Sequence, residues 1–138
     1  MADDAIKPAV VAALVKDGWT ITHDPYTIRV GKDRLMVDLG ASRPLLAAER
    51  GEERIAVEIK SFASGSPLRE FEQTLGQYVV YASLMRRRDP DRKLVVAVGE
   101  GEYRRLVAKP AVTFVLADQP IPFVVVRLGT EEVVEWTS

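Results

Sequence analysis

The stretch of sequence that decides the fold is Arg54-Ile-Ala-Val-Glu-Ile-Lys60, in which larger apolar residues alternate with polar or small ones. Alternation with a period of two is typical of a β-strand, because successive side chains point to opposite faces of a sheet. Ile55, Val57 and Ile59 therefore face a core. Glu58 and Lys60 face the opposite side, where a carboxylate and an ammonium group lie about 7 Å apart along the strand.

Four β-rich runs come before this strand, at residues 19–22, 26–30, 34–39 and 45–49. Residues 31–33 predict a hairpin between the second and third runs, and residues 50–53 predict another between the fourth run and the strand at 54–60. Apolar residues at helical spacing predict a helix over residues 8–17. The first half of the chain is therefore predicted to be a helix followed by strands in a meander.

A long helix follows the central strand. Ser66-Pro67 predicts its start, because serine caps a helix and proline fits its first turn, and an apolar stripe continues to about Arg87. A buried strand, two short helices and a closing hairpin come next, at residues 93–98, 102–109, 111–117, 122–128 and 131–137. This order predicts the α/β class, an α+β mixed sheet flanked by helices, in one domain over residues 1–138.

The composition excludes several classes of protein. The chain of 138 residues has no cysteine and one histidine, which excludes disulfide scaffolds, thiol catalysis, Cys-ligated zinc and multi-His metal sites. It contains no run of eighteen apolar residues, and its acidic start is unlike a secretory signal. We therefore expect a soluble cytoplasmic domain without a membrane span.

The formal net charge of −1 gives no overall attraction to nucleic acid. Basic residues nevertheless cluster at residues 86–93 and 104–109, and acidic residues cluster at 49–58 and 131–135. The basic clusters have two interpretations. They are either solvated faces, with cations favoured at a helix C-terminus, or a phosphate-binding rim.

Three acids are candidate metal ligands. Glu58 can bind a hard cation such as Mg²⁺ through oxygen, and Lys60 can orient a metal-bound water or meet charge that grows on a phosphate. Asp38, at the end of a neighbouring run, either shares the cation with Glu58 or only opens a turn at residues 39–42. Glu49 is either a further ligand or a hairpin-end acid that faces Arg50 or Arg54.

The long helix adds two polar residues. Gln77 and Tyr81 are four residues apart, so they share one face of the helix. Both can hydrogen-bond a phosphate or a metal-bound water, and Tyr81 can alternatively be a core residue. His23 and Asp24 stand beside Pro25, where we expect turn residues, with Asp24 bonding backbone amides, rather than a general base.

Taken together, these residues resemble the PD-(D/E)XK nuclease superfamily. Its pattern is matched by Asp38, then Glu58-x-Lys60, then Gln77-x-x-x-Tyr81 on the next helix, the last element looking like that of the RecB-like branch. The resemblance implies a restriction-endonuclease-like core of order α-β-β-β-α-β, which the predicted element order fits with an extra hairpin inserted.

Almost the whole chain also looks like the XisH family. The matching segments include residues 14–25, 29–30, 37–40, 47–49, 55–62, 75–77, 124–125 and 133–136. That family is named for a factor needed for excision of the fdxN DNA element in cyanobacteria, which acts beside a partner called XisI and a separate recombinase. One departure lies near the first helix, where Ile6-Lys7-Pro8 replaces an expected polar residue such as histidine.

The resemblance implies an excision controlling factor that acts on DNA as a metal-dependent endonuclease. Asp38, Glu58 and the backbone carbonyl of Ile59 would hold Mg²⁺ or Mn²⁺, and Lys60 would position the attacking water. Gln77 and Tyr81 would then line the path of the phosphate.

Two alternatives remain open. One is a non-catalytic regulator that acts through a XisI-like protein, since small nuclease-like domains often need a partner or a second copy, as in a homodimer, to cover DNA. The other is that Glu58 and Lys60 form only an ion pair that stabilises the sheet, which would contribute about 0–1 kcal/mol if exposed.

Overall fold

The computed structural model of the chain describes residues 2–45 and 51–137. The helices in this part are α1 (Ala2–Lys16), α2 (Pro67–Arg88), α3 (Glu100–Val107) and α4 (Pro110–Asp118). The strands are β1 (Thr20–His23), β2 (Tyr26–Val30), β3 (Asp33–Val37), β4 (Leu39–Pro44), β5 (Glu52–Ile59), β6 (Arg92–Gly99), β7 (Phe123–Arg127) and β8 (Glu132–Trp136).

Six of these strands form one mixed sheet in the order β1-β4-β5-β6-β7-β8. β5 runs antiparallel to β4 and parallel to β6, and β6 is parallel to β7. Parallel neighbours need a crossover connection, which α2 supplies between β5 and β6, and α3 with α4 between β6 and β7. The predicted mixed sheet flanked by helices is therefore confirmed.

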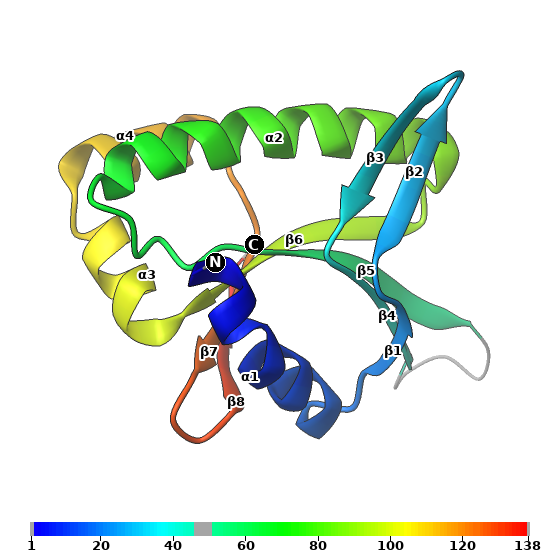
Figure 1. Cartoon of the computed structure of the whole chain (residues 1–138), viewed down its shortest axis with the longest axis horizontal. Coiled ribbons are helices and arrows are strands. Elements are labelled where there is room, and N and C mark those ends of the chain that lie inside the picture. Colours follow the sequence, from blue (N-terminus) through cyan, green and yellow to red (C-terminus); the bar gives the residue numbers. More distant parts are fainter. Residues whose placement is uncertain (1, 46–50, 138) are drawn as a thin grey trace.

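Helices cover both faces of this sheet (Figure 1). On one face, Val10, Ala13 and Leu14 of α1 are buried in a cluster with Val57 and Ile59 of β5. On the other face, α2, α3 and α4 bury a second cluster against β6 and β7. The predicted alternation along β5 is confirmed, because its larger apolar residues face α1.

The β2–β3 hairpin forms a separate two-stranded sheet. One of its faces packs against α2 and the large sheet, with Tyr26, Ile28, Val30, Leu35 and Val37 in a third apolar cluster. The hydroxyl of Tyr26 also donates a hydrogen bond to Asp89 at the end of α2 (2.9 Å). Figure 1 shows the hairpin crossing the C-terminal part of α2 at a steep angle, with its turn clear of the helix. The predicted hairpin is confirmed.

One strand lies largely outside the predicted runs. The antiparallel partner of β5 is β4, Leu39–Pro44, and the run predicted at residues 45–49 lies almost entirely outside the described residues. One of the two interpretations of Asp38 placed a turn at residues 39–42, where the structure has β4. Gly40 instead serves close packing between β1 and β4, since a Cβ at this position would lie 2.9 Å from Nδ1 of His23.

The first helix also differs from the prediction. It begins at Ala2 rather than at residue 8, and Pro8 lies inside it. Proline has no backbone N–H and fits a first turn best, which explains the late predicted start. The additional turns make a tertiary contact, because the Asp3 carboxylate accepts a hydrogen bond from the Ser61 N–H (2.7 Å).

The second helix begins as predicted, with the Ser66 hydroxyl accepting a hydrogen bond from the Arg69 N–H (3.3 Å). Over the residues that the structure describes, no helix combines the length and apolar character needed to cross a membrane.

Candidate metal centre and the adjoining cleft

Asp38 and Glu58 lie side by side where β4 begins. In the β4–β5 pairing Leu39 is opposite Val57, and the same register continued by one residue places Asp38 opposite Glu58. The N–H of Asp38 accordingly lies 3.4 Å from Oε1 of Glu58. Leu39 and Val57 belong to the cluster under α1. Alternation therefore turns Asp38 and Glu58 towards the α2 side.

At the end of β5, the Asp38 carboxylate accepts a backbone hydrogen bond that a carbonyl of a neighbouring strand would otherwise accept. The chain enters the large sheet only at Leu39, after the β2–β3 hairpin, so the pairing of β4 with β5 ends at Leu39 and Val57, before it reaches Ile59. Oδ2 of Asp38 accepts the Ile59 N–H instead, at 2.7 Å. The N–H and C=O of one strand residue point to the same edge. The Ile59 carbonyl is therefore directed to the edge occupied by Asp38, as its predicted role as a ligand requires.

Glu58 is buried beside another acid, with an exposed fraction of 8%. Burial disfavours its charged form and the Asp38 carboxylate repels a second negative charge, so the pKa of Glu58 rises to about 7. Lys60 acts in the opposite direction, with its Nζ 3.7 Å from Oε2 of Glu58. Near neutral pH about half of the Glu58 side chains are therefore protonated, and a cation shared with Asp38 would displace that proton.

The α2 helix presents polar side chains to Glu58. Nε2 of Gln77 donates a hydrogen bond to the Tyr81 hydroxyl (3.1 Å), so these residues share a helical face as predicted. Together with Thr74 and Tyr78 they line a narrow crevice against Glu58, with no space for a water molecule. The sequence carried no signal for Thr74, whose hydroxyl bonds a carbonyl of its own helix.

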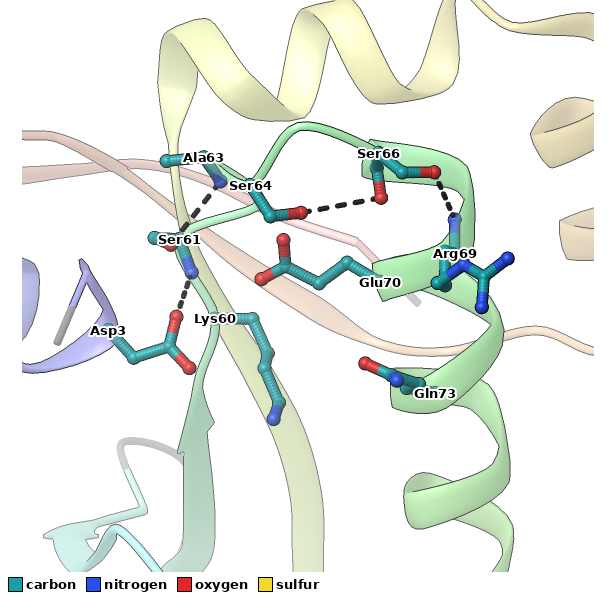
Figure 2. A pocket seen from close by; sticks show the side chains of 9 residues that line it. All are labelled: Asp3, Lys60, Ser61, Ala63, Ser64, Ser66, Arg69, Glu70 and Gln73. Carbon is teal, nitrogen blue, oxygen red and sulfur yellow. Dashed lines mark hydrogen bonds between the residues drawn. The ribbon is translucent and has the colours of Figure 1, made fainter.

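Lys60 also lines an open cleft of about 500 Å³ between the end of β5 and the start of α2. Figure 2 shows Lys60 running along one wall, with Glu70 and Gln73 of α2 on the facing wall and Asp3 of α1 beside it. Arg69 also lines the cleft, with its guanidinium group directed away from Lys60. Lys60 is thus in contact with Glu58 and also with the space open to solvent.

Two carboxylates fix the backbone that follows Lys60. Asp3 accepts the Ser61 N–H (2.7 Å), and Oε1 of Glu70 accepts the Phe62 N–H (3.1 Å). Phe62 has a φ of 52°, in the left-handed region that residues other than glycine seldom adopt. Asp3 and Glu70 were not predicted here, because acids in a first helical turn are ordinarily explained by the helix dipole.

The oxygen donors around Asp38 fit a hard cation. Two carboxylates and the Ile59 carbonyl are the kind of ligand that Mg²⁺ and Mn²⁺ accept, with water completing the shell. Across residues 2–45 and 51–137, no group of three or more His, Cys, Asp or Glu side chains is placed to hold a metal. Glu49, the predicted further ligand, lies outside the described residues.

His23 and Asp24 make contacts typical of structural residues. The His23 ring packs edge-on against Tyr26, with centroids 5.1 Å apart, and Nδ1 shares a hydrogen bond with the Thr22 hydroxyl (2.8 Å). Asp24 forms an ion pair with Lys7 of α1 (2.6 Å), where hydrogen bonds to backbone amides were expected.

The basic clusters divide between helix ends and ion pairs. Residues 86–88 are arginines in the last turn of α2, where cations interact favourably with the helix C-terminus. On α3, Arg104 forms an ion pair with Glu100 (2.9 Å) and Arg105 forms one with Glu102. These positions agree with the interpretation as solvated faces.

Known proteins of the same fold share this arrangement of elements. The chain is 35% identical to an XisH family protein from Nostoc punctiforme, whose crystal structure superposes with a TM-score of 0.83 over 95% of this chain and 97% of that one. It is 33% identical to a fdxN element excision controlling factor protein from Anabaena variabilis, with a TM-score of 0.85 over 98% of this chain and 99% of that one.

The sequence comparison agrees with the structural one. A search of curated proteins finds no match. The family model described as XisH protein matches residues 1–134, which is nearly the whole chain. The chain therefore belongs to the XisH family.

Proposed function

We propose that this XisH-family chain is an excision controlling factor for a DNA element and acts as a Mg²⁺- or Mn²⁺-dependent endonuclease with a PD-(D/E)XK core. The observation that carries the proposal is the meeting of Asp38, Glu58 and Lys60 on one face of the sheet. The role in excision is supported by the relative from Anabaena variabilis, which is called a fdxN element excision controlling factor.

Asp38, Glu58 and the Ile59 carbonyl would hold the cation. When bound, the ion supplies Lewis-acid polarisation of a phosphodiester and lowers the pKa of a bound water. The chain itself fixes the ligands, because the Ile59 N–H holds the Asp38 carboxylate at 2.7 Å. A ligand held by the protein backbone in this way loses little further entropy when a cation binds.

Lys60 and the α2 residues would act on the substrate. The Lys60 ammonium group contacts Glu58 at 3.7 Å and also lines the cleft, so a water or a phosphate entering from the cleft meets its positive charge. Gln77 and Tyr81 lie on the helix face that borders Glu58. The crevice that they line is closed to water, so they would donate hydrogen bonds to a phosphate once the crevice widens.

Nicking of supercoiled DNA tests this proposal. Wild type, Lys60→Ala and Lys109→Ala are compared with Mg²⁺, with Mn²⁺ and with EDTA. Lys109 is an exposed lysine at the start of α4, so its removal controls for the loss of one positive charge. We expect nicking by wild type and Lys109→Ala only when the metal is present, and loss of at least about 100-fold in Lys60→Ala. Equal background nicking in all samples would end the catalytic proposal.

A second candidate function is a non-catalytic regulator that binds a XisI-like protein, or a second copy of the chain. It is favoured by the net charge of −1, and by the grouping of only two acidic side chains at the centre within the described residues. Size-exclusion chromatography with the XisI-like protein provides the test. An equal shift for wild type and Asp38→Asn, together with no nicking by wild type, would support the regulator. An apparent mass of twice the chain, measured for the protein without the XisI-like protein, would reveal a homodimer.

A further inference from the structure

The outer face of the β2–β3 hairpin carries two arginines directly opposite each other. Arg29 of β2 pairs with Arg34 of β3 in the register, and both side chains are exposed. Thr27 and Met36 form the adjacent pair on the same face, where Met36 is 51% exposed. The opposite face is the one that packs on α2. The arginine pair therefore has no place in the hydrophobic core.

This pair of like charges works against folding. Side chains directly opposite in an antiparallel pair have Cβ atoms about 5 Å apart, and like charges at this separation are destabilising. Arg29 and Arg34 form no ion pair in the part of the chain that the structure describes. Lys32 in the turn adds a third positive charge, and Asp33 is the one acid between residues 26 and 37. A polyanion would neutralise this surface.

The hairpin is connected directly to the candidate metal centre. β3 ends at Val37, and the next residue is Asp38. At about 3.3 Å per residue, Arg34 lies roughly 13 Å along the strand from Asp38. One strand of DNA advances about 3.4 Å per nucleotide. This distance corresponds to about four nucleotides of one DNA strand, and a duplex that follows the hairpin would meet the arginine pair on the face that points away from α2.

From these observations we infer that the β2–β3 hairpin is an arm that binds the phosphate backbone of double-stranded DNA, with Arg29 and Arg34 as its paired phosphate contacts. The inference rests on the proposed function in taking DNA as the substrate. It extends that function by assigning DNA affinity to a surface outside the carboxylate pair. A two-stranded ribbon also has the width that the major groove admits.

Binding measured without metal separates this inference from nuclease activity. Fluorescence anisotropy in EDTA compares wild type with Arg29→Gln/Arg34→Gln on two 30-base-pair duplexes of unrelated sequence, over a series of salt concentrations. The matched control is Arg104→Gln/Arg105→Gln, which removes the same charge from α3, at the other end of the molecule in Figure 1.

Loss of two phosphate contacts should make the negative slope of log K against log salt shallower by about 1.8, and weaken binding to both duplexes roughly 10–100-fold at 0.1 M salt. The control should keep the wild-type slope, and thermal unfolding should show that the hairpin variant is no less stable than wild type. Equal weakening in the control, or an unchanged slope in the hairpin variant, would overturn the inference. So would a measurement in which poly-glutamate, a polyanion without phosphate, binds wild type as tightly as the duplexes do. Loss of DNA binding in the hairpin variant, with no nicking by wild type, would overturn the nuclease proposal alone.

Discussion

Replacing Glu58 by glutamine should make the metal-free protein more stable at pH 8. Glutamine resembles the protonated acid but never ionises. The pKa of Glu58 is raised from its ordinary value of 4.5 to about 7 by burial and by the Asp38 carboxylate. At roughly 1.4 kcal/mol per pKa unit, this rise corresponds to a destabilisation of up to about 3 kcal/mol when the folded protein ionises Glu58.

The sign of the effect follows from proton binding. Between pH 4.5 and about 7 the folded state keeps the Glu58 proton and the unfolded state releases it, so the free energy of unfolding falls as the pH rises. The contribution is fully present below pH 4.5 and lost above about pH 7. Wild type and Glu58→Gln should therefore have equal stability near pH 4 and differ increasingly up to pH 8.

Urea denaturation in EDTA from pH 4 to pH 8 measures this difference. The matched control is Glu72→Gln, which makes the same change at an exposed site on α2 and should follow wild type within about 0.5 kcal/mol at each pH. Parallel curves for wild type and Glu58→Gln across this range would refute the reasoning, because they would mean that Asp38 and burial do not raise the pKa of Glu58.

Three further predictions concern the cation, the end of α2 and the hairpin. Mg²⁺ should raise the melting temperature more at pH 8 than at pH 6, because the cation competes with the Glu58 proton for the site. At a free Mg²⁺ concentration 100 times Kd, binding would add about 2.7 kcal/mol to the free energy of unfolding. An equal rise in melting temperature for Glu58→Gln would contradict the site. Asp89→Asn should lower the free energy of unfolding, measured in urea, by about 2–3 kcal/mol. The change removes the ion pair (2.8 Å) of the Arg92 side chain, which is only 6% exposed. A decrease of less than about 0.5 kcal/mol would contradict a stabilising role for this ion pair. Arg34→Glu should raise the free energy of unfolding by about 0.2–1 kcal/mol, because it places a negative charge opposite Arg29, and it should weaken DNA binding. A lower free energy of unfolding would contradict repulsion between the two arginines.

Local periodicity was enough to predict much of the fold. The alternation through Ile55, Val57 and Ile59 identified the central strand and its two faces, since a strand between two helical layers must separate its side chains in this way. Ser66 identified the start of α2, because a capping hydroxyl acts on its own chain three residues on. Spacing along α2 likewise placed Gln77 and Tyr81 on one face.

Features that depend on distant segments could not be predicted. Gly40 is a strand residue because it pairs with His23 of β1 on one side and with Ala56 of β5 on the other. The meeting of Asp38 with Glu58 depends on the register between β4 and β5, which spacing along one segment does not specify. Asp3 reaches Ser61 only through the packing of α1 against the sheet. These contacts arise from tertiary structure, so no local pattern carries them.

Asp38 lies at the junction between the β2–β3 hairpin and the large sheet. Asp38 is tied to β5 through the Ile59 N–H, and the backbone on its other side continues into the hairpin without a spacer. A rigid rotation of the hairpin by about 10° around this residue would carry its tip, roughly 17 Å away, through about 3 Å. A carboxylate about 2 Å from the axis would move by only about 0.4 Å, within the tolerance of a pre-organised site. Because the inner face of the hairpin is packed on α2, only displacements of this size fit the fold, and they leave the spacing of the ligand oxygens unchanged.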